Sequence, residues 1–258
     1  MEYIIKEEAG FKYIEEGEGE VLVLLHGLMG ALSNWEGVIE EFKHRYTVVI
    51  PMLPIYDLPL LTTGVKTLAK YVHKFVKFKK YKNFTLLGNS LGGHVGLIYT
   101  LSHQDYVKAL ILTGSSGLYE NAFGGSFPKR ENYDFIKEKV EFTFFKPETA
   151  TKELVDEVFE TVNNRNKVIR ILAMAKSAIR HNMAKELNKI SVPVLLIWGK
   201  NDIVTPPEVA VEFHELLPNS ELNWVDECGH APMMEVPDEF NAALHNFLKK
   251  FSVPATNS

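Results

Sequence analysis

The sequence predicts an α/β fold with a mostly parallel, twisted sheet and helices on both of its faces. Short apolar runs without polar alternation recur along the chain, and such runs are typical of strands that are covered on both faces. Helical patterns lie between most of these runs, which is the succession that produces parallel strands. The chain has 258 residues, 46% of them hydrophobic and 24% charged, so it can bury a full core.

The elements follow one another in a regular order. Two N-terminal segments with β character, residues 3–5 and 11–14, come first. Buried strands are expected at residues 21–25, 47–50, 84–87, 109–112 and 194–198, and a further strand at 221–225. Helices with one apolar face are expected at residues 34–42, 65–78, 91–102, 208–217 and 238–251. Each of these helices can pack its apolar face on the sheet.

Residues 117–187 interrupt this alternation. They carry no apolar run of the buried-strand kind, and instead show aromatic and helical stretches at 133–145, 152–162 and 167–183. A segment of about 70 residues is too long for a plain loop in a compact domain. We therefore expect a helical insertion, a lid, at residues 117–187, between two parts of one core at residues 1–116 and 188–258.

Charge and composition exclude several classes of function. The formal net charge of −5 provides no basic field for phosphates, so nucleic acid is not an expected partner. The N-terminus lacks the pattern of a secretory signal, and no apolar run approaches the roughly 20 residues that span a bilayer. The single cysteine, Cys228, fits a reducing compartment without excluding the periplasm. We expect a cytoplasmic protein that acts on a small molecule, without a membrane partner, and leave open whether it forms a homodimer.

A serine stands in a turn between a predicted strand and a predicted helix. The segment Gly88-Asn89-Ser90-Leu91-Gly92 has the pattern G-x-S-x-G, in which a tight turn lifts the serine hydroxyl above the sheet. Glycines are needed where backbone and helix crowd that turn. The alternative is a glycine-rich turn in which Ser90 is an ordinary helix cap.

A second segment, His26-Gly27-Leu28, follows the strand at 21–25. A backbone amide just past such a strand can point at the space above a nucleophile. The amides of Leu28 and Leu91 would then bind a developing oxyanion. Alone, a His-Gly pair is usually only a strand end with a turn glycine.

Two further polar residues follow predicted strands, Asp202 after 194–198 and His230 after 221–225. The carboxyl ends of parallel strands lie on one edge of a sheet, so both residues can meet Ser90 there. The order Ser, Asp, His is that of one of three common serine-triad lineages. Asp226 competes for the carboxylate role, but it would have to fold back along its own strand end, so Asp202 is favoured.

With these motifs, the chain resembles α/β-hydrolase-fold proteins over nearly its whole length. Residues 88–93 and the segment Cys228-Gly229-His230-Ala231-Pro232 are similar to those of small bacterial carboxylesterases and meta-cleavage-product hydrolases. The resemblance implies that Ser90 is the nucleophile, His230 the base and Asp202 its partner, and that a helical lid is present. Relatives with an aspartate nucleophile are disfavoured, because position 90 is serine.

Two departures from the family stand out. A Pro-Gly-x-Gly-x-Ser run often follows the strand that corresponds to residues 46–51, whereas residues 52–59 read Met-Leu-Pro-Ile-Tyr-Asp-Leu-Pro. The shape of that loop is therefore left open. Carbon–carbon bond hydrolases often place a tryptophan after the catalytic histidine, and Ala231 stands there instead.

The expected reaction is hydrolysis of a carboxylic ester of a small or medium hydrophobic substrate, through an acyl-enzyme on Ser90. Leu28, Met29 and the aromatic insertion favour an apolar acyl or aryl group, with Phe142 and Phe145 as candidate pocket residues beside Met29. Cleavage of a meta-cleavage product by the same residues is one alternative, and a non-catalytic ligand-binding or sensor protein is another. No metal-ligand spacing or phosphate-binding loop is present, so no cofactor or metal is expected.

Overall fold

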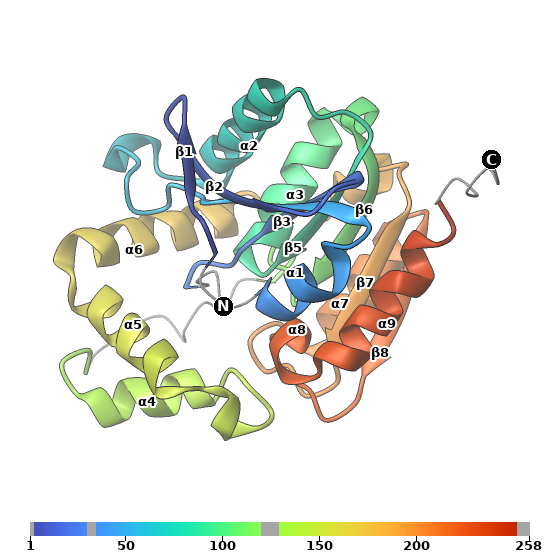
Figure 1. Cartoon of the computed structure of the whole chain (residues 1–258). Coiled ribbons are helices and arrows are strands. Elements are labelled where there is room, and N and C mark those ends of the chain that lie inside the picture. Colours follow the sequence, from blue (N-terminus) through green and yellow to red (C-terminus); the bar gives the residue numbers. More distant parts are fainter. Residues whose placement is uncertain (1–2, 30–34, 120–128, 252–258) are drawn as a thin grey trace.

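The computed structural model describes residues 3–29, 35–119 and 129–251. An eight-stranded sheet lies at the centre of the molecule (Figure 1). Its strands are β1 (Lys6–Glu8), β2 (Phe11–Glu16), β3 (Glu20–Leu25), β4 (Tyr46–Pro51), β5 (Phe84–Asn89), β6 (Val107–Thr113), β7 (Val194–Gly199) and β8 (Ser220–Val225). Their order in the sheet is β1-β2-β4-β3-β5-β6-β7-β8. Strand β2 pairs antiparallel with both of its neighbours, β1 and β4. Every other neighbouring pair in this order is parallel.

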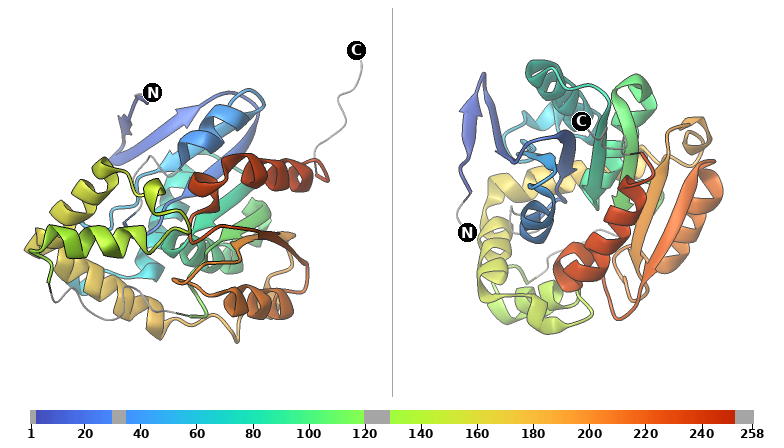
Figure 2. Two further views of the ribbon diagram at one scale, coloured as in Figure 1. Left: turned by 90° about the horizontal axis from the view of Figure 1, so that it is seen from below. Right: turned by 45° about the vertical axis from the view of Figure 1, so that its right-hand side comes forward.

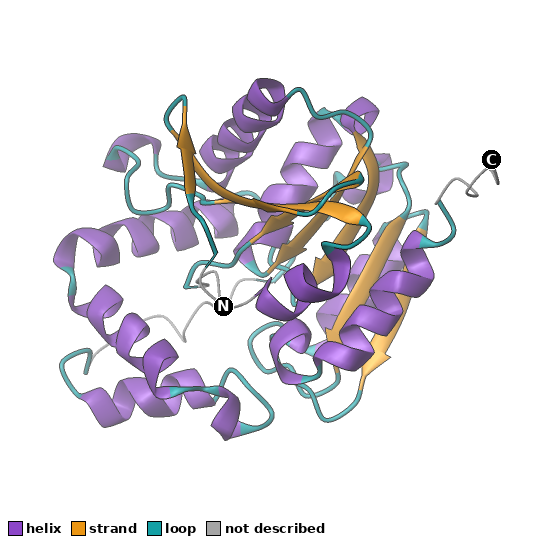
Figure 3. Cartoon of the chain, in the orientation of Figure 1, coloured by secondary structure: helices purple, strands orange, loops and turns teal. Residues whose placement is uncertain are grey.

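Helices cover both faces of this sheet (Figure 3). One apolar cluster joins the sheet to α2 (Val65–Lys79), α3 (Leu91–Ser102) and α7 (Pro207–Leu216). A second cluster on the other face includes α1 (Glu36–Phe42) and α9 (Pro237–Leu248). In β3, Val23 and Leu25 belong to the first cluster, whereas Leu22 and Leu24 belong to the second. This explains why the strand sequences show no polar alternation.

The segment between β6 and β7 is helical, with α4 (Tyr133–Glu141), α5 (Lys152–Asn163) and α6 (Arg165–Arg180). Figures 1 and 2 show the three helices grouped on one side of the sheet. Side chains cap their first turns: Asn132 accepts from Phe135 N–H, Thr151 from Leu154 N–H and Asn164 from Asn166 and Lys167 N–H. These caps set where each helix begins. No helix in the described part of the chain is both long enough and apolar enough to cross a bilayer.

The fold class predicted from the sequence is confirmed, but some element bounds differ. The expected N-terminal strand at 3–5 is instead β1 at Lys6–Glu8, because a left-handed turn at Ala9 and Gly10 pairs that segment with β2. The helix expected over 133–145 ends at Glu141. Beyond it, Thr143 O accepts from His230 N–H, and Phe145 N–H donates to the carboxylate of Glu235. Position 34, expected to begin the first helix, lies outside the described residues.

The turn from β5 to α3 leaves no room for a side chain at Gly92. A Cβ there would lie 2.1 Å from the carbonyl oxygen of Leu25, which is backbone and cannot move aside. Gly96, one turn later, offers a matched control, because its Cβ would meet side-chain atoms of Leu110 and Leu86, the nearest of them Leu110 Cδ1 at 3.4 Å. Gly92→Ala should lower the free energy of unfolding by about 1–3 kcal/mol or more. Gly96→Ala should leave it unchanged or raise it by up to about 1 kcal/mol.

Urea unfolding followed by circular dichroism measures both values. Equal losses in the two variants would contradict this account of the turn.

Candidate active site

Ser90 is the single residue between a strand and a helix. Strand β5 ends at Asn89 and α3 begins at Leu91, so Ser90 occupies the turn with φ 53° and ψ −121°. A positive φ is unusual for a residue with a side chain, and such strain costs on the order of 1–3 kcal/mol. The backbone is fixed there, since Ser90 N–H donates to Thr113 O at 3.2 Å and Ser90 O accepts from Ser116 N–H at 3.1 Å. The serine side chain makes no capping hydrogen bond, so Ser90 does not act as an ordinary helix cap.

A buried carboxylate orients the imidazole of His230. Asp202 is 2% exposed, and its Oδ2 lies 2.9 Å from His230 Nδ1. The same carboxylate accepts from Val204 N–H at 2.8 Å and, through both oxygens, from Thr205 N–H at 2.9 Å and Thr205 Oγ1 at 2.8 Å. These bonds fix the carboxylate, and the bond to Nδ1 leaves Nε2 of His230 able to accept a proton.

Asp226, the competing carboxylate, lies elsewhere. It is an exposed residue whose Oδ1 lies 2.7 Å from Lys200 Nζ. The structure therefore places Asp202, and not Asp226, against His230.

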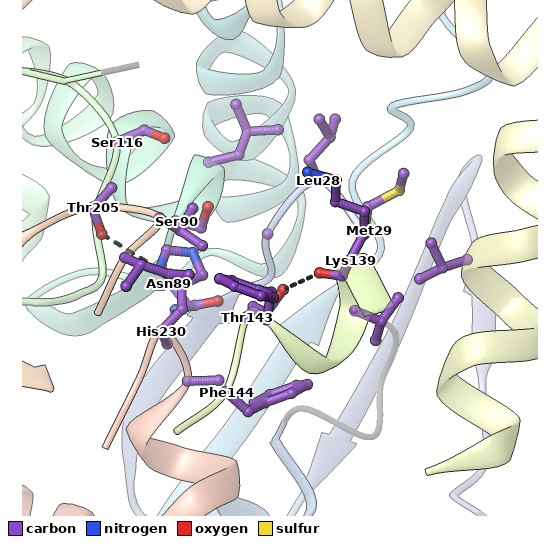
Figure 4. Close-up of a pocket in the computed structure, with 18 of the residues that line it drawn as sticks. Leu28, Met29, Asn89, Ser90, Ser116, Lys139, Thr143, Phe144, Thr205 and His230 are labelled. Atoms are coloured by element: carbon purple, nitrogen blue, oxygen red, sulfur yellow. Dashed lines mark hydrogen bonds between the residues drawn. The ribbon is translucent and has the colours of Figure 1, made fainter. Parts of the chain in front are cut away.

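Backbone contacts hold the His230 loop in place from several directions. Asn89 Nδ2 donates to His230 O at 3.2 Å and to Thr113 O at 3.0 Å. His230 N–H donates to Thr143 O at 3.0 Å. Gly114 has φ 50°, and a Cβ on it would lie 2.8 Å from His230 Nδ1, so only glycine leaves room for the ring. Ser90 and His230 are both among the residues that line one pocket (Figure 4).

Glu235 ties the same loop to the helical insertion. Its Oε1 accepts from Gly229 N–H at 3.0 Å and Ala231 N–H at 3.3 Å, on either side of His230. Its Oε2 accepts from Phe145 N–H at 2.7 Å. Sequence reasoning missed Glu235, Thr205 and Asn89, although Asn89 directly precedes Ser90 in the turn motif.

The two proposed oxyanion donors lie at the expected strand end and helix start. Leu91 is the first residue of α3, where backbone N–H groups have no partner within the helix. Leu28 follows β3, and its peptide is oriented by His26. Leu53 N–H donates to His26 Nε2 at 3.1 Å, so His26 Nδ1 carries the proton and donates to Gly27 O at 2.9 Å. Burial lowers the pKa of His26, which agrees with this neutral form.

The pocket above Ser90 has a volume of about 330 Å³ and mostly apolar walls. Residues from α5 and α6 form much of one side: Leu154, Val158, Met174, Ala175 and Ala178. Near Ser90 the polar groups come from Asn89, Ser116, Thr205 and His230 (Figure 4).

The structure corrects one candidate pocket residue. Met29 and Phe142 line the pocket, with Phe142 70% exposed, whereas Phe145 is not among the lining residues and Phe144 is. Phe144 is buried, but Phe145 is 41% exposed and bonded to Glu235 through its backbone. The aromatic spacing alone could not indicate this, because the chain leaves the helix before reaching these residues.

Cys228 is not suited to act as a nucleophile. The thiol is buried, and burial, followed by the charge of Glu235, raises its pKa far above the usual range. It therefore stays protonated and packs as a small apolar group. Within residues 3–29, 35–119 and 129–251, no three His, Cys, Asp or Glu side chains gather in a way that could hold a metal ion.

Comparison with known proteins relates this geometry to a family. A family model described as alpha/beta hydrolase fold matches residues 20–165 and 161–237. The 2-hydroxy-6-oxo-6-(2'-aminophenyl)hexa-2,4-dienoic acid hydrolase of Metapseudomonas resinovorans is 29% identical over 93% of this chain and 87% of that protein. The pimeloyl-[acyl-carrier protein] methyl ester esterase of Nitrosomonas europaea is 27% identical over 87% of this chain and 94% of its own length.

A solved structure is more similar still. MGS-MChE2, an α/β hydrolase enzyme from the metagenome of sediments from the lagoon of Mar Chica, Morocco, is 50% identical, with a TM-score of 0.81 over 96% of this chain and 99% of that one. Family model, relatives and fold agree, and the chain belongs to the α/β-hydrolase family as one of its hydrolases.

Proposed function

We propose that this hydrolase cleaves carboxylic esters of small or medium hydrophobic substrates through an acyl-enzyme on Ser90. The main support for this proposal is the arrangement of three side chains: Ser90 and His230 line the same apolar pocket, and Asp202 is hydrogen-bonded to His230 Nδ1. The esterase from Nitrosomonas europaea supports the ester as substrate class.

In this mechanism His230 Nε2 takes the proton of Ser90 Oγ, and the oxygen attacks the ester carbonyl carbon. The backbone N–H groups of Leu28 and Leu91 stabilise the tetrahedral oxyanion. His230 then gives the proton to the leaving alcohol, and water hydrolyses the acyl-enzyme by the same steps. Asp202 keeps the imidazole in the required tautomer and stabilises its charged form.

The pocket favours an uncharged acyl group. Among the described lining residues, Lys139 is the one lysine or arginine, and its side chain is exposed. The walls from α5 and α6 are aliphatic, which suits burial of an alkyl or aryl chain. In this proposal residues 117–187 act as the lid over the core formed by residues 1–116 and 188–258.

Carbon–carbon bond hydrolysis is a second candidate, favoured by the similarity to the Metapseudomonas resinovorans dienoic acid hydrolase. Such an acid carries a carboxylate, which a buried cation would have to balance. The exposed Lys139 does not offer that, so the ester is favoured. A non-catalytic ligand-binding protein on the same fold is a third candidate.

The assignment of Ser90 and Asp202 is tested by three variants. Ser90→Ala should abolish turnover of p-nitrophenyl butyrate, because no nucleophile remains. Asp202→Asn should lower kcat by roughly 10³–10⁴-fold, since the imidazole loses its orienting acceptor. Asp226→Asn is the matched control and should keep full activity, because Asp226 contacts Lys200 at the surface.

The steady-state parameters of each variant are compared with those of the wild-type protein, after thermal unfolding has shown that the variant is as stable as the wild type. A loss in Asp226→Asn as large as that in Asp202→Asn would overturn the carboxylate assignment. A fluorophosphonate probe should label the wild-type protein stoichiometrically at Ser90, and an unlabelled Ser90 would favour the ligand-binding candidate.

In this proposal, the pocket-lining residues of α6 limit the length of the acyl chain that the pocket can hold. Ala175→Phe should fill part of the pocket and lower kcat/KM for p-nitrophenyl octanoate far more than for p-nitrophenyl acetate. Ala173→Phe, on the same helix but outside the lining residues, is the control and should leave the chain-length preference unchanged. If a dienoate ring-cleavage product is consumed faster than every ester in the panel, the carbon–carbon candidate replaces the ester.

A further inference from the structure

The loop after β4, which departs from the family pattern, sends a side chain back to the candidate oxyanion site. Tyr56 Oη donates to Leu28 O at 2.9 Å. The other acceptor in reach, Met29 Sδ, is more distant at 3.8 Å and weaker, so the carbonyl receives the proton. Tyr56 is not among the residues that line the pocket, so it has no place in direct substrate contact.

Together with a bond from His26, this hydrogen bond holds the backbone on both sides of Leu28. The carbonyl of Gly27 accepts from His26, and it shares a peptide plane with Leu28 N–H. Because a trans peptide holds its C=O and N–H antiparallel, that bond sets the direction of the N–H. Tyr56 fixes the next peptide plane through Leu28 O. The backbone on both sides of Leu28 is therefore held, and its N–H has one direction.

The tyrosine is in turn held by helix α6. Lys167 Nζ lies 5.2 Å from the centroid of the Tyr56 ring, within the range of a cation–π contact. Arg170 Nε donates to Leu58 O at 2.9 Å, two residues beyond Tyr56. Further along, Val65 N–H donates to Ser177 Oγ at 3.2 Å. Helix α6 thus contacts the chain at three points between Tyr56 and the start of α2.

We propose that Tyr56 is a positioning residue that holds the Leu28 amide in place as an oxyanion donor, and that helix α6 holds Tyr56. This inference rests on the proposed function, because it assigns a task only if an oxyanion forms above Ser90. Burial raises the pKa of Tyr56, so the hydroxyl remains a donor at neutral pH.

A role in aligning the donor has a distinct kinetic signature. The interaction strengthens as the oxyanion develops, so losing it lowers kcat while KM is preserved. Removing an oxyanion donor completely costs about 10²–10³ in kcat. Misaligning one donor should cost less, and we expect a loss of roughly tenfold in kcat.

Tyr56→Phe is the test, since it deletes the hydroxyl and keeps the ring beside Lys167. With p-nitrophenyl butyrate we expect kcat to fall roughly tenfold and KM to stay within about twofold. Affinity for an alkyl trifluoromethyl ketone, which forms an oxyanion on the serine, should fall by the same factor as kcat. Tyr71→Phe is the matched control, because Tyr71 is partly buried against the same apolar cluster and lies on α2, outside the loop that contacts Leu28.

The role of Tyr56 is overturned if kcat and ketone affinity in Tyr56→Phe match those of Tyr71→Phe. If Tyr56→Phe does not fold, Lys167→Met provides the test, with a smaller fall in kcat and an unchanged KM expected, and no fall in kcat overturning the role. A wild-type protein that neither hydrolyses esters nor reacts at Ser90 with fluorophosphonate removes the proposed function itself. The two failures are therefore distinguishable.

Discussion

At the carboxyl ends of the strands, backbone segments approach one another so closely that glycine is needed at several of the contacts. Strands β7 and β8 pair in register from Val194 with Ser220 to Gly199 with Val225, so the loops that follow them start side by side. A Cβ on Gly199 would lie 2.2 Å from Gly229 O, so the two loops can touch only because glycine stands there. This contact brings Asp202 within 2.9 Å of His230. Similar constraints act at Gly114 beside His230 and at Gly27, whose Cβ would lie 3.3 Å from Ser90 Cβ.

The helical insertion is bound to this edge by hydrogen bonds as well as by apolar packing. Thr143 and Phe145 pair with the His230 loop and with Glu235, while Arg170 binds the loop that carries Tyr56. The first set of hydrogen bonds reaches the segment around His230, and the second reaches the loop whose Tyr56 contacts Leu28. The insertion therefore shapes the pocket and supports the residues that would act in it. In such an arrangement, changes far from Ser90 can alter its surroundings through the backbone.

The fold and the identity of the candidate residues were accessible from the sequence, because both depend on local patterns. Strands buried on both faces appear as unbroken apolar runs, and parallel strands collect their following loops at one edge. The turn around Ser90 needs glycines on both sides, and these glycines can be read directly from the sequence. The fold class and the resemblance to α/β hydrolases were confirmed for this reason.

Other features depend on contacts between distant segments and left no local signal. Whether Phe144 or Phe145 lines the pocket is decided by the pairing of this segment with the His230 loop, which no periodicity indicates. Tyr56 and Glu235 are hydrogen-bonded to backbone groups of other segments, and Asp226 contacts Lys200 instead of His230.

If Ser90 is the nucleophile, it becomes acylated during turnover, and mass spectrometry of the protein quenched during ester hydrolysis can detect the acyl group. The peptide containing Ser90 should gain the mass of the acyl group, and its fragmentation should place the group on this serine. Turnover with the acyl group on another residue, or with no acylated peptide under conditions where deacylation is slowed, would contradict it.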